Sequence, residues 1–326
     1  MLRFSRNGSA RRPTLARMEL LVLSEARDEV GASASAQDMI EMTRAAALVG
    51  CRVVYIPKDF AGCETADNAL WRIEPQPSPT PAVWLGFIPS RERYEAIYHA
   101  AAARNVHLLN TPDEHLRALE LDRALPLLGE LTPRSVVLRE GSAPADWHGA
   151  THELGFPLFV RGTARSRKAA GWKACVADIP EELEALVAEM FGLPYRARGR
   201  VIVRRIVPLR HSRTSDQGFP LGREFRLFLL GERVLGCGYY WEGSDPLRDL
   251  TPDEEREVFA LAQEAARRVG TPFIAVDVGQ VEGGAWTIIE VGDAQFAATG
   301  QMSRLSLWNA LRDAALSQNG GTDPNS

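Results

Sequence analysis

Apolar and polar positions follow two different patterns along the chain, and the change lies near its middle. Over residues 18–110, short apolar runs alternate with amphipathic stretches of helical length. The apolar runs are Glu19–Ser24, Arg52–Ile56, Ala82–Phe87 and Val106–Leu109, and the amphipathic stretches are Ala36–Val49 and Arg91–Arg104. Strands that alternate with helices are typical of βαβ units and a parallel sheet. The pattern therefore predicts a small α/β domain in this part of the chain.

Two helix starts carry the same four residues. Thr111–Glu114 and Thr251–Glu254 both read Thr-Pro-Asp-Glu, which supplies an N-cap, a proline at the first helical position and the glutamate of a capping box. We expect the first helix to run to about Leu128 and the second to end near Gly270. A further amphipathic helix is expected over Pro180–Met190.

The second half contains strands rich in basic residues. Three segments have this pattern: Arg200–Leu209, Arg223–Leu230 and Arg233–Trp241. Gly231-Glu232, between the last two, fits a two-residue hairpin turn. The segment Arg210–Leu221 is polar and longer than the 2–5 residues or so of most hairpin connections. We expect it to be a mobile lid or substrate loop, and the alternative is a tolerated surface insertion.

The run Arg161–Lys168 interleaves basic residues with glycine, serine and threonine. Backbone amides and guanidinium groups both suit phosphoryl oxygens, so the run is a candidate phosphate clamp. A solvated basic loop is the equally weighted alternative.

Two apolar, β-branched runs near the C-terminus, Phe273–Val278 and Trp286–Val291, flank a Gly-rich segment. This is the pattern of a β-hairpin. Each run contains one acidic residue, Asp277 in the first and Glu290 in the second. If the turn is centred on Gly283-Gly284, residues whose numbers sum to 567 face each other, and the two acids satisfy that sum.

Two carboxylates opposed across a strand pair repel each other unless a cation lies between them. Magnesium is the natural candidate, because it takes oxygen ligands and keeps water and substrate phosphates in its remaining positions. Asp293, just beyond the second run, is a candidate third ligand. The alternative is a solvated hairpin with acids on its wet face, although acids within such apolar runs are costly to bury unpaired.

Composition and charge narrow the class of protein. The chain has 326 residues, of which 45% are hydrophobic, so it has room for about two domains. A net charge of −4 gives no overall attraction to nucleic acid or to an anionic membrane, and no apolar run approaches the roughly 20 residues of a bilayer span. Four cysteines without metal spacing are expected to be reduced, as in a cytoplasmic protein.

The first 17 residues contain five arginines and no acid. They superficially resemble a transit peptide or a nucleic-acid-binding arm. Met18 directly precedes the first apolar run, which favours an over-extended start or a disordered basic tail.

Taken together, these residues resemble an ATP-grasp enzyme, and the second half is most similar to the clade with two arginines and one lysine among its nucleotide contacts. The resemblance covers about residues 18–315. It implies a pre-ATP-grasp α/β domain over 18–110, followed by α+β ATP-grasp lobes with antiparallel sheets over 111–317. It also implies ATP and magnesium as cofactors. Disordered tails are expected at 1–17 and 318–326.

The resemblance also implies a set of site residues. The metal-binding positions match Asp277 and Glu290, with Asp293 as a third ligand. The nucleotide contacts match Arg123, Arg161, Lys168, Arg204, Arg205, Ile206, Val207 and Glu224, the last of these at the position that holds the ribose hydroxyls. Lys168 and Arg226 are the expected catalytic residues, because Arg226 shares a strand face with Glu224 and can reach a phosphate or an acyl phosphate.

The chain departs from the family pattern at several of these positions. Ala275 stands where an arginine often precedes the metal-binding Asp, so Arg226 is expected to supply that charge. Gly292 occupies the usual position of the third metal ligand, an asparagine. Arg204-Arg205 replaces an acidic hinge residue, so we expect backbone groups to recognise adenine.

The leading functional hypothesis is an ATP-dependent ligase that joins a carboxylate to an amine through an acyl phosphate, with an amino acid, peptide or protein carboxylate as substrate. The alternatives are a phosphotransferase on the same scaffold and a nucleotide-sensing protein without turnover. The expected partner is a small-molecule or peptide substrate. We expect neither nucleic acid nor membrane as a partner, and a homodimer is left open.

Overall fold

The computed structural model describes residues 19–26, 33–58 and 65–319. The basic tail predicted at 1–17 lies outside these residues. The tail predicted to begin at 318 starts inside a helix that continues to Asn319, and its remainder also lies outside the described residues. Cys51, Cys175 and Cys237 form no disulfide with one another, whereas Cys63 lies outside the described residues.

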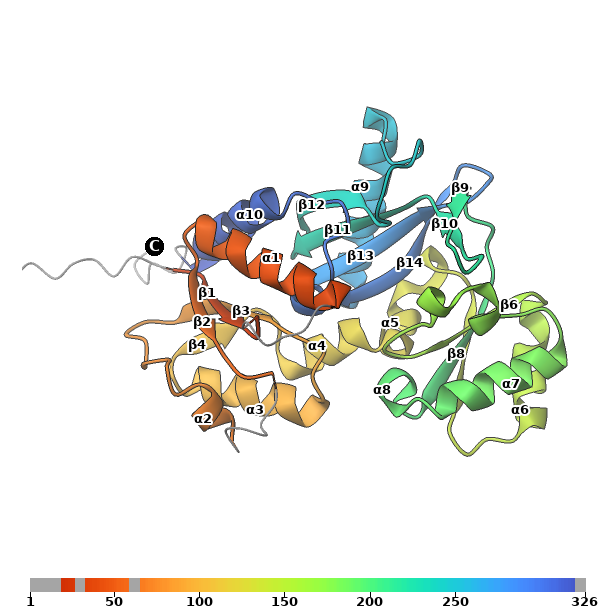
Figure 1. Cartoon of the computed structure of the whole chain (residues 1–326), viewed down its shortest axis with the longest axis horizontal. Helices are drawn as coiled ribbons and strands as arrows, with labels where there is room; N and C mark the ends of the chain where they lie inside the picture. The colour runs from red at the N-terminus through yellow and green to blue at the C-terminus, as the bar shows by residue number, and fades with distance from the viewer. Residues whose placement is uncertain (1–18, 27–32, 59–64, 320–326) are drawn as a thin grey trace, which may run out of the picture.

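The N-terminal part is a parallel sheet with helices on both faces (Figure 1). Its strand order is β2-β1-β3-β4, and all three pairings are parallel. The strands are β1 (Leu21–Ser24), β2 (Arg52–Tyr55), β3 (Thr80–Leu85) and β4 (Val106–Leu108), and the helices are α1 (Ala34–Leu48), α2 (Ala66–Ala69) and α3 (Arg91–Ala102). The alternating pattern in the sequence predicted this sheet because each buried strand is followed by an amphipathic segment that covers it.

The helix expected from Thr111 to Leu128 is two helices, α4 (Pro112–Leu119) and α5 (Leu121–Leu128). The Thr111 capping box forms as predicted. Glu120 interrupts the helix with an extended backbone at φ −91° and ψ 97°. The backbone N–H of Leu121 then donates to Thr163 O at 3.0 Å, so a tertiary contact takes the place of a helical one.

The middle lobe is an antiparallel sheet with strand order β5-β8-β6-β7. Its strands are β5 (Ser135–Arg139), β6 (Leu158–Gly162), β7 (Val176–Ala177) and β8 (Arg200–Arg205), and its helices are α6 (Pro144–Thr151), α7 (Pro180–Phe191) and α8 (Pro194–Ala197). Leu183, Val187 and Met190 of α7 are buried in the core of this lobe. β8 ends at Arg205, four residues before the predicted end, so the chain beyond it is free of the ladder.

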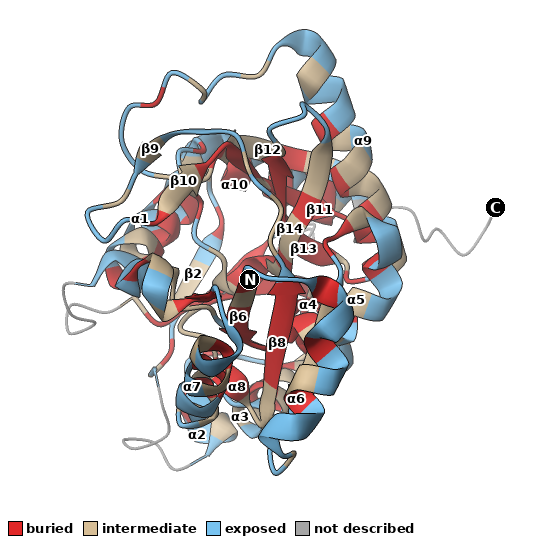
Figure 2. Ribbon diagram, turned by 90° about the vertical axis from the view of Figure 1, so that its right-hand side faces the viewer, coloured by how far each residue is buried: buried red, intermediate tan, exposed pale blue. Residues whose placement is uncertain are grey.

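The C-terminal lobe is a second antiparallel sheet, with strand order β12-β11-β13-β14. Its elements are β11 (Glu224–Leu230), β12 (Arg233–Tyr239), β13 (Phe273–Gln280), β14 (Trp286–Asp293), α9 (Pro252–Val269) and α10 (Arg304–Asn319). Every residue of β13 is buried, and Figure 2 shows the buried strands behind the exposed outer face of α9. α10 packs against α1, so this lobe and the N-terminal sheet share one hydrophobic core.

The predicted class, an α/β domain followed by α+β lobes with antiparallel sheets, is confirmed. None of the helices in the described part of the chain combines the length and the hydrophobicity that a bilayer span requires.

Candidate active site

The two acids of the C-terminal hairpin face each other across β13 and β14, as predicted: Asp277 is the cross-strand partner of Glu290. The turn differs from the one assumed. Val281 N donates to Ala285 O at 2.9 Å, so the loop has three residues and the facing numbers near it sum to 566. A bulge at Ile289 adds one residue to β14 and restores the sum of 567 from the acids onward.

Both acids are paired with arginines. Arg226 lies directly opposite Asp277 on β11, and its Nε and Nη2 donate to the two carboxylate oxygens at 2.7 Å each. Arg161, on β6 of the middle lobe, donates to Glu290 Oε1 at 2.7 Å. Burial by itself would raise the pKa of Glu290, but Arg161 outweighs it and lowers this pKa to about 2. Both carboxylates are therefore held in the ionised form that a metal ion requires.

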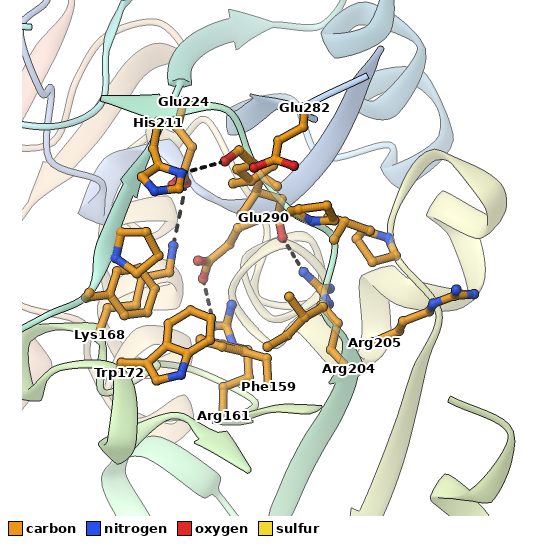
Figure 3. Close-up of a pocket in the computed structure, with 18 residues that line it drawn as sticks. Phe159, Arg161, Lys168, Trp172, Arg204, Arg205, His211, Glu224, Glu282 and Glu290 are labelled. Carbon is orange, nitrogen blue, oxygen red and sulfur yellow. Dashed lines mark hydrogen bonds and ion pairs between the residues drawn. The ribbon is translucent and has the colours of Figure 1, made fainter. Parts of the chain in front are cut away.

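A cavity of about 260 Å³ lies between the middle and C-terminal lobes (Figure 3). Phe159 and Trp172 line it on the middle-lobe side. Its charged lining includes Arg161, Lys168 and Glu290, so an apolar chamber adjoins the carboxylate pair.

The chain segment that joins the two lobes borders this cavity. Ile206 and Val207 directly follow β8 and line the cavity, and neither makes a backbone hydrogen bond within the described residues. Arg204 is buried, and it donates to Ile289 O at 2.6 Å; burial, together with Arg161, lowers its pKa to about 9. Arg205 is exposed and points away from the cavity (Figure 3). The groups available to a ligand here are those of the backbone.

Glu224, at the start of β11, is buried and faces Lys168, with 3.5 Å between Oε2 and Nζ. Burial raises the pKa of Glu224 in spite of this partner. For Lys168 the balance is the reverse, because burial lowers its pKa but Glu224 outweighs burial and the pKa is raised. Glu224 Oε2 accepts no hydrogen bond from the described residues, so a donor hydroxyl from a ligand fits there.

A second cavity of about 830 Å³ contains the carboxylate pair. Arg226, Asp277 and Glu290 line it, and it shares Lys168, Phe219 and Glu290 with the first cavity. The two cavities are therefore parts of one cleft, with an apolar chamber at one end and charged groups at the other.

Residues 148–311 match the model of an ATP-grasp domain family, described as family 3 of its clade. The chain belongs to this ATP-grasp family. The match covers about half of the chain and spans the acidic hairpin, both hinge arginines and the residues around Lys168. No curated protein sequence matches the chain significantly.

Solved structures with a similar fold cover nearly the whole chain. A RimK domain protein ATP-grasp from Sphaerobacter thermophilus is 16% identical, with 90% of this chain and 98% of that chain covered and a TM-score of 0.56. D-alanine–D-alanine ligase from Bacillus anthracis, complexed with ATP, is 11% identical, with 85% and 86% covered and a TM-score of 0.58. The ATP-grasp ligase PsnB, complexed with minimal precursor, Mg and ADP, is 11% identical, with 92% and 98% covered and a TM-score of 0.56.

The ATP-grasp cleft does not contain Arg123, which was expected to converge with Arg161 and Lys168. The Arg123 side chain is 41% exposed, and its Nε donates to Glu120 Oε2 at 2.6 Å. It lines neither cavity. The break at Glu120 turns α5 relative to α4, and a pattern read as one continuous helix could not place this side chain.

Asp293 is not placed as a third metal ligand. It alternates to the opposite strand face from Gly292, and its carboxylate is buried in a hydrogen-bond network. His115 Nδ1 lies 2.7 Å from Asp293 Oδ2, and Asn110 Nδ2 donates to Oδ1 at 2.9 Å. No group of three potential ligands is found among the described residues. Asp293 instead connects the end of β14 to the N-terminal part of the chain.

The segment Arg210–Leu221 is not an irregular loop. It forms an antiparallel hairpin from β9 (His211–Thr214) and β10 (Pro220–Gly222). Its tip lies over the cleft, because Phe219 packs against Phe159 and Trp172 of the middle lobe, with ring centroids 6.5 and 5.9 Å apart.

Two cleft residues were not singled out from the sequence. Arg165 and Arg196 both line the larger cavity. Arg165 was visible only as one of several basic residues in Arg161–Lys168, and nothing in the local pattern of the short helix α8 marks Arg196. His148 and His152, which are four residues apart, gather no metal-ligand set among the described residues; His148 Nε2 lies 2.6 Å from Glu184 Oε1.

Proposed function

We propose that this protein is an ATP-dependent carboxylate–amine ligase that acts through an acyl phosphate. The observation that carries the proposal is the single cleft in which an apolar chamber opens onto the Asp277/Glu290 pair. The similar folds of a D-alanine–D-alanine ligase with ATP and of the ligase PsnB with Mg and ADP support the same reaction class.

The smaller cavity suits the adenosine part of ATP. Its apolar walls accommodate a base, and the unpaired backbone groups of Ile206 and Val207 can recognise the base edge. The open Oε2 of Glu224 accepts from a ribose hydroxyl. Arg161 and Lys168, at the charged end, then bind the phosphates.

The carboxylate pair suits magnesium. Asp277 and Glu290 supply oxygen ligands, and a site with two protein carboxylates is typical of magnesium bound together with nucleotide phosphates. When bound, Mg-ATP supplies the phosphoryl group to be transferred and the ion neutralises its charge. Arg226 holds the Asp277 carboxylate ionised and in one orientation through two parallel hydrogen bonds.

The reaction balances without a nucleophilic side chain. A substrate carboxylate oxygen attacks the γ-phosphorus, and the bond from that phosphorus to ADP breaks. The amine nitrogen then attacks the acyl carbon, phosphate leaves with the C–O electron pair, and the amine loses a proton to solvent. Lys168 and Arg226 stabilise the negative charge on the phosphoryl oxygens, so the protein contributes position and charge. This accounts for the absence of a Ser-His or Cys-His dyad from the sequence.

Product analysis tests the proposal. The purified protein is incubated with ATP, magnesium and mixtures of amino acids and short peptides, and ADP, free phosphate and amide are measured by chromatography and mass spectrometry. We expect the three to appear in equal amounts. ADP with a phosphorylated product and no free phosphate would identify a phosphotransferase instead. Nucleotide binding without ADP release in any mixture would indicate a sensing protein.

A further inference from the structure

Arg165 carries an uncompensated positive charge at the wall of the cleft. Its guanidinium makes no hydrogen bond or ion pair with any described residue, whereas Arg161 and Arg167 in the same loop pair with Glu290 and Glu189. Burial lowers the pKa of Arg165, and Arg196 lowers it further. A cation repelled by its own neighbours is stabilised when an anion binds beside it.

Arg165 also borders a third, smaller cavity of about 100 Å³. Apolar side chains dominate its wall: Met39, Met42, Leu85, Phe87 and Phe296. Asp38 is the acid among the described lining residues, and its Oδ1 is already bonded to Thr299 and Arg304, at 3.0 and 2.7 Å. Arg165 lines this cavity and the large one, so it lies where the two meet.

The small cavity occupies a position where α/β sheets bind ligands. It lies beyond Leu85, at the carboxyl end of β3. β3 lies on the other side of β1 from β2, so the strand order reverses there. Crevices at such a reversal, outside the carboxyl ends of the strands, are the usual ligand sites of open α/β sheets.

We propose that the amine substrate of this enzyme is a small α-amino acid with a short apolar side chain, and that Arg165 binds its carboxylate. The side chain enters the small cavity, whose volume is roughly three times the ~30 Å³ that one water molecule occupies in the liquid, so about three heavy atoms fit. The amino group then lies in the large cavity with Asp277 and Glu290. This inference rests on the ligase function proposed above.

Binding measured without turnover tests the inference. The protein with magnesium and a non-hydrolysable ATP analogue is titrated calorimetrically with alanine, valine and tryptophan, each as both enantiomers, and with the uncharged amides of alanine and valine. We expect alanine or valine to bind, its amide to bind roughly tenfold to a hundredfold more weakly, and tryptophan not to bind. Arg165→Gln should weaken the amino acid to the level of the amide and leave affinity for the ATP analogue unchanged.

Two further variants separate the role of Arg165 from general effects. Arg167→Gln removes a neighbouring charge that lines none of the three cavities, and it should bind amino acids like the wild type. Ala298→Leu adds bulk at an exposed lining residue and should weaken valine more than alanine.

Three results would overturn the inference: no amino acid binds the wild type, Arg165→Gln binds amino acids as tightly as the wild type, or Arg165→Gln loses the ATP analogue instead. Failure of the ligase function is distinguishable. In that case amino acids bind through Arg165, yet ATP is never consumed in their presence.

Discussion

Arg226 and Asp277 face each other across β11 and β13 and are joined by two parallel hydrogen bonds of 2.7 Å. In the family pattern an arginine often stands two residues before the metal-binding aspartate, where this chain has Ala275. The cross-strand arginine brings a positive charge to the same strand face from the neighbouring strand. Burial would lower the pKa of Arg226, but Asp277 raises it, so the guanidinium stays charged.

Replacing Arg226 should therefore impair the reaction more than the fold. Arg226→Lys keeps a positive charge but cannot form the bidentate pair, so we expect kcat to fall roughly tenfold to a hundredfold with the melting temperature little changed. Arg233→Lys, an exposed position on the adjacent strand β12, is the matched control. Steady-state kinetics and thermal unfolding measure both effects. Wild-type kcat in Arg226→Lys would contradict the assignment.

Glu290→Gln should abolish magnesium-dependent turnover. With a pKa of about 2 the carboxylate is ionised throughout any practical assay range, and the neutral amide is a poor magnesium ligand. We expect ADP release to fall by about 10²–10³-fold, with the circular dichroism spectrum unchanged. Glu184→Gln, far from the cleft, controls for loss of one carboxylate. Near wild-type turnover in Glu290→Gln would remove Glu290 from the metal site.

Nucleotide affinity should depend on pH through Glu224. Burial raises the pKa of this carboxyl above its ordinary value, so on acidification it becomes protonated before other glutamates do. The neutral form is a weaker acceptor for a ribose hydroxyl, and ATP affinity should therefore fall as the pH drops through the raised pKa. The same titration of Glu224→Gln supplies the baseline for protonation of ATP itself. An identical pH profile in wild type and variant would show that Glu224 does not hold the ribose.

The hairpin over the cleft should be fastened by Asp245. This buried carboxylate accepts hydrogen bonds from Ser212 and Arg213 of β9, each at 2.8 Å. Burial by itself would raise the pKa of Asp245, but these bonds and one from Leu247 N–H lower it from 3.8 to about 2. Since the folded pKa is depressed, the stabilisation is complete above about pH 4 and is lost as the pH falls through 2.

Asp245→Asn should consequently lower the free energy of unfolding by about 2 kcal/mol at pH 7, and the deficit should shrink between pH 4 and pH 2. Denaturant unfolding across this range measures it, with the exposed Asp253→Asn as control. Because the hairpin covers the cleft, the variant should also hydrolyse ATP without forming amide. A deficit that does not change with pH would show that the ionised carboxylate is not what fastens the hairpin.

Much of the fold follows from local pattern. The strands of the parallel sheet and the capped starts of α4 and α9 were predictable because each depends on residues close together in the chain. The opposition of Asp277 and Glu290 also follows from one hairpin, although the bulge at Ile289 was needed to make the assumed register correct. Local rules succeeded where the partner lies within one turn or one hairpin.

The partners of charged residues were decided only by tertiary structure. Arg161 meets Glu290 across 129 positions of chain, and Glu120 interrupts a helix that the sequence pattern continued, which leaves Arg123 outside the cleft. Asp293 has the composition of a metal ligand, but the pleat turns it towards His115.

The sequence by itself therefore determined the order of elements, the ATP-grasp resemblance and the acidic pair. The tertiary structure decided which arginines are neutralised and which one, Arg165, is left to bind a ligand. The physical reason is that hydrophobic periodicity and capping act over a few residues, whereas a charge is compensated by whatever the fold brings within a few ångströms.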